Sequence, residues 1–126
     1  FSNALPPPIA AAAIAAIDLA EQGDELRSHL FDNAKRFRAG MAKAGFNLLP
    51  GEHPIIPVML GEAKPAQDMA ARLYEKGIYV TGFFFPVVPK GAARIRTQMS
   101  AAHSSADVDA AIMAFTEVGR ELRVIP

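Results

Sequence analysis

Residues 86–103 read Pro-Val-Val-Pro-Lys-Gly-Ala-Ala-Arg-Ile-Arg-Thr-Gln-Met-Ser-Ala-Ala-His. The Pro-x-x-Pro-x-Gly part predicts a rigid turn, and the residues after it predict a short strand. Because strand side chains alternate between faces, Arg94 and Arg96 should share one face and Ile95 should point to the other. An arginine on a strand beside a fixed loop suits a small carboxylate, since its planar fork donates two parallel hydrogen bonds. Arg-x-Arg strands also serve as surface ion-pair partners, so the pattern by itself leaves both roles open.

Two more apolar segments predict strands that accompany this one, which we expect to run from Arg94 to Met99. The first covers Ile55 to Leu60. Pro57 within it predicts an edge position or a bulge, because proline has no amide hydrogen to donate. The second covers Ile78 to Phe83.

Helical signals occupy the N-terminal third of the chain. Prolines 6–8 followed by alanines and isoleucines predict a helix to about Glu21, which Gly23 breaks. A second helix is expected to begin near Asp24, whose side chain would cap it, and to end at Gly45. Apolar residues at steps of three and four give that helix one apolar face: Leu26, Leu30, Ala34, Phe37, Met41 and Ala44.

Two further helices are predicted between and after the strands. One runs from Pro65 to Lys76 and is closed by Gly77. The other begins at Ser104, with Asp107 three residues on as a short-armed form of the capping box. Its apolar stripe is Val108, Ile112, Phe115, Val118 and Leu122.

This order predicts a single small α/β (α+β) domain. A short sheet covered by helices would occupy residues 46–126. Residues 1–45 would form an N-terminal helical arm that packs against something outside the chain.

Composition narrows the range of functions. The 126 residues include 13 basic and 13 acidic side chains and no cysteine. The charge balance gives no field that would attract nucleic acid or an anionic membrane, and the lack of thiols excludes disulfides and cysteine nucleophiles. The three histidines, His29, His53 and His103, show no metal-ligand spacing, so no metal site is expected. His29 is expected to be solvated, and His103 is balanced between packing at a helix start and a role in a site.

Three segments closely resemble the α-oxoamine synthases, a family of pyridoxal 5′-phosphate (PLP)-dependent enzymes of fold type I: Ile55–Gly61, Gly77–Gly91 and Ala93–His103. The opening residues Phe1–Pro7 resemble the start of the C-terminal portion of these enzymes. Two motifs resemble those of the members that join glycine with acetyl-coenzyme A. They are the Phe-Phe before Val-Val-Pro-Lys and the Arg-Thr-Gln-Met-Ser ending. The resemblance extends to about Ile125.

The resemblance implies roles for individual residues. Arg96 matches the residue that holds the α-carboxylate of the amino acid, and Arg94 would be structural. Ser2 and Asn3 match a segment that reaches the cofactor phosphate of the neighbouring subunit, which implies a homodimer. The residues expected to line an acyl-coenzyme A entrance are Lys90, Val87 and Val88. Phe85 stands where relatives often carry tyrosine, which puts any hydroxyl-dependent role there in doubt.

The family binds PLP through a lysine in a Ser/Thr-rich, glycine-flanked segment. No lysine here has that context: Lys35, Lys43, Lys64, Lys76 and Lys90. The resemblance therefore implies a C-terminal domain that lacks the large PLP-lysine domain and has no catalytic residue of its own. The absence of cysteine fits an expected location in the cytoplasm. The alternatives are another α-oxoamine synthase, such as 8-amino-7-oxononanoate synthase, or a non-catalytic α/β module that binds a small acid or mediates assembly.

Overall fold

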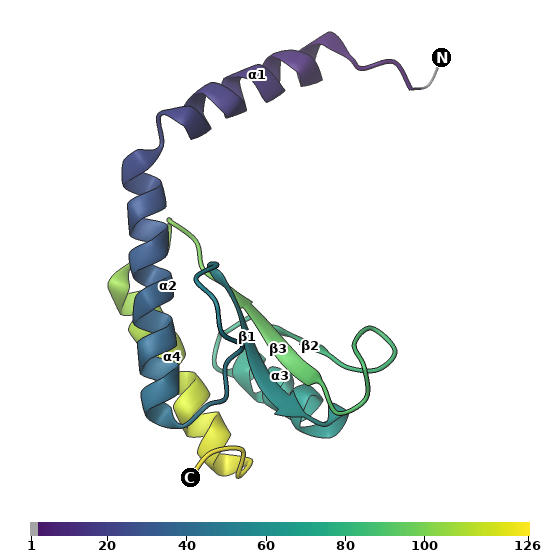
Figure 1. Cartoon of the computed structure of the whole chain (residues 1–126), viewed down its shortest axis with the longest axis vertical. Coiled ribbons are helices and arrows are strands. Elements are labelled where there is room, and N and C mark those ends of the chain that lie inside the picture. Colours follow the sequence, from purple (N-terminus) through teal and green to yellow (C-terminus); the bar gives the residue numbers. More distant parts are fainter. Residues whose placement is uncertain (1–2) are drawn as a thin grey trace.

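A three-stranded antiparallel sheet lies at the centre of the computed structural model, which describes residues 3–126 (Figure 1). Its strands are β1 (Ile55–Gly61), β2 (Thr81–Phe83) and β3 (Ala93–Gln98), in the spatial order β1-β3-β2. The expected first and third strands are confirmed to within a residue. Pro57 lies on the edge strand β1, as predicted, and its carbonyl accepts a hydrogen bond of 3.2 Å from the amide of Leu49.

The predicted strand Ile78–Phe83 is too long, because only Thr81–Phe83 pair with β3. The amide of Ile78 donates instead to the carbonyl of Leu73, 2.9 Å away, and so closes the preceding helix. Ile78 and Val80 pack against the core without joining the ladder. Their alternating apolar pattern thus reports burial, not sheet pairing.

The four helices are α1 (Pro7–Glu21), α2 (Asp24–Ala44), α3 (Ala63–Glu75) and α4 (Ser105–Glu121). Gly45 ends α2 at a φ of 100°, the left-handed conformation that was expected there. The capping box of α4 is confirmed: the amide of Asp107 donates to Oγ of Ser104 at 3.2 Å, and the amide of Ser104 donates to Oδ2 of Asp107 at 2.8 Å.

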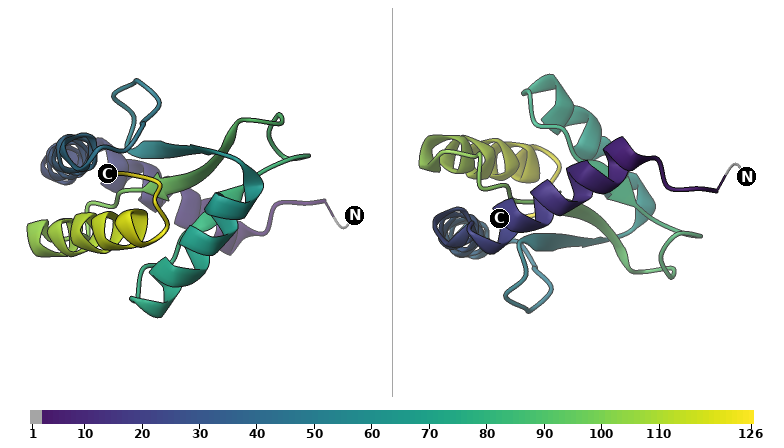
Figure 2. Two further views of the ribbon diagram at one scale, coloured as in Figure 1. Left: turned by 90° about the horizontal axis from the view of Figure 1, so that it is seen from below. Right: turned by 90° about the horizontal axis from the view of Figure 1, so that it is seen from above.

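One face of the sheet packs on the helices, and Figure 2 shows α3 and α4 on that side with α2 beside α4. Ile56, Val58 and Ile95 contribute fully buried side chains from the strands. The rings of Phe37 and Phe115 meet edge to face with their centroids 5.8 Å apart. The C-terminal part of α2 therefore belongs to the same core as α4.

Gly40 allows this close approach of α2 and α4. A Cβ added there would lie 2.5 Å from Cδ1 of Ile112, closer than side-chain atoms approach one another. The N-terminal part of α2 extends beyond the core, so Leu26 is exposed and the predicted apolar stripe is buried only farther along the helix.

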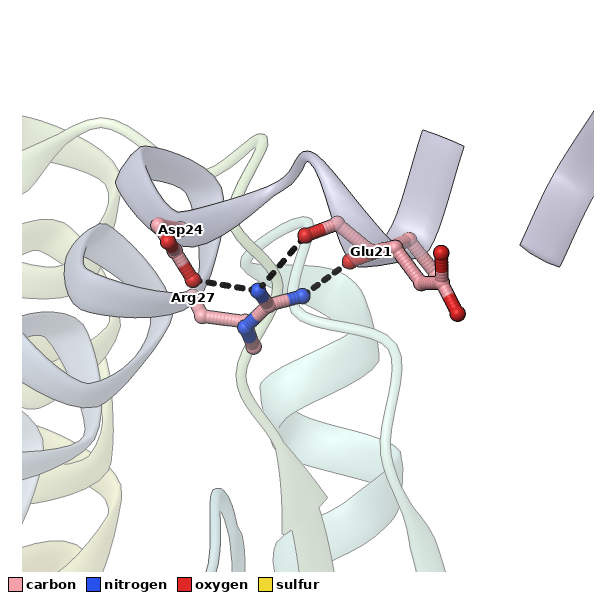
Figure 3. A network of polar contacts seen from close by, with 4 residues as sticks. Glu21, Asp24 and Arg27 are labelled. Carbon is pink, nitrogen blue, oxygen red and sulfur yellow. Dashed lines mark hydrogen bonds and ion pairs between the residues drawn. The ribbon is translucent and has the colours of Figure 1, made fainter. Parts of the chain in front are cut away.

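Arg27 makes the polar contacts at the junction of α1 and α2 (Figure 3). Its guanidinium donates to the carbonyls of Ala20 and Glu21 and pairs with the carboxylate of Asp24.

The prediction that Asp24 caps α2 is wrong. Gly23 occupies the cap position, and no side chain there accepts a hydrogen bond from the helix.

Figure 1 shows α1 apart from the sheet, and this helix has no buried residue. Within residues 3–126, no helix has both the length and the apolar character that crossing a membrane requires.

Candidate functional site

Arg94 and Arg96 share one face of the sheet, as the sequence predicted, and this face lies opposite the helices. Ala93, Ile95 and Thr97 of β3 are buried, whereas Arg94 is half-buried and Arg96 is exposed. This alternation follows from the two-residue period of a strand. The sheet thus places two guanidinium groups on one open face.

Arg96 has neighbours on both sides. Pro57 of β1 and Thr81 of β2 lie directly opposite it in the ladder, and Phe83 lies two residues farther along β2, opposite Arg94. The guanidinium carbon of Arg96 lies 4.5 Å from the centroid of the Phe83 ring. Across residues 3–126, no side chain or carbonyl accepts a hydrogen bond from Arg96, and no carboxylate forms an ion pair with it. Its fork of N–H groups is therefore available to a ligand.

Arg94 has different surroundings. Its Nε donates to the carbonyl of Ala92 at 3.1 Å, so the side chain is tied to the turn that precedes its own strand. It also lies opposite Met59 on β1 and Phe83 on β2. An arginine that donates to the backbone stabilises the start of the strand and has fewer donors left for a ligand.

Arg96 borders a groove of about 670 Å³ between the end of the sheet and α4. Apolar side chains such as Phe83, Val108 and Phe115 form part of its wall, and His103 and Thr81 add polar atoms. Among the described residues no lysine lines this groove. The arrangement can bind a small anion beside apolar surface but offers no amine for covalent attachment of a carbonyl compound.

The turn before β3 is held by backbone hydrogen bonds, as predicted. The amide of Val87 donates to Phe84 at 2.9 Å, and the amide of Ala92 donates to Pro89 at 3.1 Å. Val87 is exposed and Val88 is half-buried. The ammonium of Lys90 lies 5.2 Å from the centroid of the exposed Phe85 ring. The loop thus exposes one cationic side chain, Lys90, and one apolar side chain, Val87.

His103 takes part in a hydrogen-bond network that joins α2 to the loop before α4. Its Nδ1 accepts from the amide of Ser100 at 3.2 Å, and its carbonyl lies 2.9 Å from Nε2 of His29. The prediction that His29 is solvated is therefore wrong, because the loop folds onto its helix. His103 serves packing at the helix start and also reaches the groove.

Asn33 is the residue of this network that sequence reasoning missed. Its side-chain amide is buried and donates to the carbonyls of Ser100, at 3.1 Å, and of His103, at 2.8 Å. The signal was present: Asn33 follows Leu30 by three residues and precedes Phe37 by four, which puts a polar side chain on the apolar face of the helix.

Asn3, which was expected at the cofactor, does not line the groove that Arg96 borders. Asn3 is exposed and precedes α1, whose N-terminal end points away from the sheet (Figure 1). Ser2 lies outside the described residues. The structure therefore does not bring Asn3 to Arg96 within one chain.

Ion pairs outside the groove hold the helices together. Arg36 of α2 donates to both oxygens of Asp109 of α4, at 2.7 and 2.5 Å. This hydrogen bonding lowers the pKa of Asp109 and raises that of Arg36. This ion pair joins two helices and does not involve Arg96.

The chain matches the family model described as aminotransferase class I and II over residues 1–115. It is 56% identical over 125 residues to the 2-amino-3-ketobutyrate coenzyme A ligase of Escherichia coli K12, covering 99% of this chain and 31% of that protein. It is 46% identical to the human mitochondrial protein of the same name, over 100% of this chain and 30% of that one. The chain thus spans about a third of these relatives and corresponds to their C-terminal part.

A solved structure shares the fold. Serine palmitoyltransferase from S. paucimobilis, solved with a bound PLP–myriocin aldimine, superposes with a TM-score of 0.91 at 30% identity, over 99% of this chain and 32% of that one. The expected fold, that of the small domain of fold type I PLP enzymes, is therefore confirmed. The chain belongs to the aminotransferase class I and II family.

Proposed function

We propose that this chain is the C-terminal domain of a PLP-dependent acyltransferase that condenses glycine with acetyl-coenzyme A to 2-amino-3-oxobutanoate and coenzyme A. The similarity to the 2-amino-3-ketobutyrate coenzyme A ligases of E. coli and human supports this proposal. The observation that carries it is Arg96, whose guanidinium has no acceptor among residues 3–126 and faces away from the core. Such a group suits the carboxylate of an amino acid.

Arg96 would hold the α-carboxylate of glycine through two charge-assisted hydrogen bonds. It would thereby fix the orientation of the bonds at the α-carbon of the bound amino acid, and holding the reacting atoms in place in this way lowers the barrier. Arg94, tied to Ala92, would keep β3 and the preceding turn in place. PLP, when bound, supplies the electron sink for the carbanion at the α-carbon.

The lysines of this chain do not fit covalent attachment of PLP. Lys64 pairs with Asp68 at 2.7 Å and Lys76 pairs with Glu117 at 2.8 Å, both at positions that do not line the groove. We therefore propose that the attachment lysine belongs to the part of the relatives' length that this chain does not cover.

A homodimer completes the proposed site. Ser2 and Asn3 of one subunit would hold the cofactor phosphate of the other, which agrees with a helix α1 that leads away from its own sheet. Lys90, Val87 and Val88 would line the acyl-coenzyme A entrance, where the ammonium of Lys90 attracts the anionic thioester carrier. We propose a cytoplasmic location for the full-length protein, which agrees with a chain that has no cysteine.

A second candidate is 8-amino-7-oxononanoate synthase, since the chain is 43% identical to the enzyme of that name from Thermoanaerobacter pseudethanolicus. The strand Arg-Ile-Arg-Thr-Gln at 94–98 differs from the Arg-Leu-Arg-Leu-Thr typical of that enzyme. Turnover of the full-length protein with glycine and acetyl-coenzyme A, compared with turnover with other amino acids and acyl-coenzyme A donors, separates the two. No turnover with any of these pairs would support the non-catalytic small-acid-binding or assembly module instead.

Substitution of Arg96 in the full-length protein tests the carboxylate clamp. We expect Arg96→Ala to weaken glycine binding by roughly 2 to 4 kcal/mol, because charged hydrogen bonds contribute about 1.5–3 kcal/mol each and do not add fully. Arg96→Lys should recover only part of this, since a point charge does not reproduce the planar fork. Spectral titration with glycine measures the affinity, and PLP content should stay unchanged.

Arg94→Lys is the matched control for this experiment. It should reduce stability more than glycine affinity, because its Nε contact to Ala92 is structural. Unchanged glycine affinity in Arg96→Ala would show that the clamp has been assigned to the wrong arginine.

A further inference from the structure

Arg96 differs from Arg36, Arg38 and Arg94 because its guanidinium contacts an aromatic ring, whereas theirs donate to oxygen atoms. Arg38 donates to the carbonyl of Leu49 at 2.9 Å, Arg94 donates to that of Ala92, and Arg36 pairs with Asp109. Within residues 3–126, only the ring of Phe83 has a recorded polar or cation–π contact with the guanidinium of Arg96.

Phe83 is well placed to be a fixed platform. It lies on β2 diagonally across from Arg96, at a spacing that an aromatic side chain can bridge, and it is half-buried. The preceding Gly82 brings β2 close to α3: a Cβ there would lie 3.0 Å from the carbonyl oxygen of Ala66. The backbone that carries the ring is thus held against a helix.

An aromatic ring supports a guanidinium without using its donors. The attraction acts between the cation and the face of the ring, and the N–H groups remain in the guanidinium plane. A carboxylate or carbonyl partner would instead occupy the donors that a substrate needs. The ring can therefore restrict the rotamers of Arg96 before the substrate arrives, which reduces the ordering cost of binding.

We propose that Phe83 is a positioning residue for Arg96 and thereby helps to set the affinity for the amino-acid carboxylate. This inference rests on the proposed role of Arg96. It predicts an effect confined to the amino-acid substrate, because Phe83 acts through the guanidinium.

The experiment uses the full-length enzyme with glycine and acetyl-coenzyme A. Phe83→Leu should raise KM for glycine by about threefold to tenfold and leave KM for acetyl-coenzyme A unchanged. This is the size of effect expected when a partly exposed cation–π contact is lost. Phe83→Tyr keeps the ring and should restore the wild-type value. Phe85→Leu is the matched control, since that ring lies under Lys90, and it should leave KM for glycine unchanged.

A double-mutant cycle separates positioning from a general loss of structure. In the Arg96→Ala background, Phe83→Leu should cause no further rise in KM for glycine. The same rise in both backgrounds would overturn the inference, and so would a Phe83→Tyr enzyme as impaired as Phe83→Leu. If Arg96→Ala itself leaves KM for glycine unchanged, the proposed clamp fails. If Arg96→Ala raises it and Phe83→Leu does not, only the inference about Phe83 fails.

Discussion

Arg94 and Arg96 show how two identical side chains on one strand face acquire different roles. The alternation of β3 gives them the same face, but their contacts come from elsewhere: the carbonyl of Ala92 for one and the ring of Phe83 for the other. Asn33 is a similar case, because its role depends on two carbonyls far along the chain. At the scale of the residue, the pattern sets direction and the fold sets partners.

Asn33→Ala should destabilise this chain. The substitution removes the two hydrogen bonds that the buried amide donates to the carbonyls of Ser100 and His103, and each such bond contributes about 0.5–1.5 kcal/mol. Chemical denaturation followed by circular dichroism measures the change in free energy of unfolding. Asn47→Ala is the control at an exposed loop position; an equal effect in both variants would contradict the role given to Asn33.

The helix α4 begins where its sequence predicts because its start signal is local. The backbone amide of each of Ser104 and Asp107 donates to the side-chain oxygen of the other, three residues away, so the start signal needs no distant partner. The hydrogen bonds from the side chain and amide of Ser104 lower the pKa of Asp107. The extent of strand β2, by contrast, is not set by local sequence, since it depends on which residues of β3 lie beside it.

The capping box predicts a pH dependence of stability. Because folding lowers the pKa of Asp107, its carboxylate stabilises the chain above the usual carboxyl pKa of about 4, and this contribution is lost as the pH falls through the folded value. Asp107→Asn should therefore reduce the free energy of unfolding at pH ~7, and the difference from the wild type should shrink below pH ~4. Unfolding curves over this pH range provide the measurement; a difference that is the same at both ends would rule out the carboxylate as its source.

The whole molecule combines a packed body with a helix that it leaves uncovered. α1 contributes no residue to the core, although it carries large apolar side chains. Four of these are each more than half exposed: Ile9, Ile14, Ile17 and Leu19. Exposed apolar surface of this extent marks a contact site. We expect α1 to be covered in the full-length protein, whose relatives are about three times as long.

This surface should make the isolated chain associate with itself or bind an environment-sensitive hydrophobic dye. The double substitution Ile14→Ser/Ile17→Ser should reduce both, whereas Ala12→Ser, which removes little apolar area, should not. Sedimentation velocity and dye fluorescence follow the two properties. A wild-type chain that stays monomeric at high concentration and binds no dye would contradict the expectation.

The sequence by itself determined the four helices, two of the three strands, the capping box of α4 and the shared face of Arg94 and Arg96. These features depend on periodicity and caps within a few residues, so adjacent side chains are sufficient to specify them. The tertiary structure decided the length of β2, the ring beneath Arg96 and the contacts of Asn33 and His29. The contacts of Asn33 and His29 join residues 67 to 74 positions apart, and only packing of α2 against the loop before α4 brings them together.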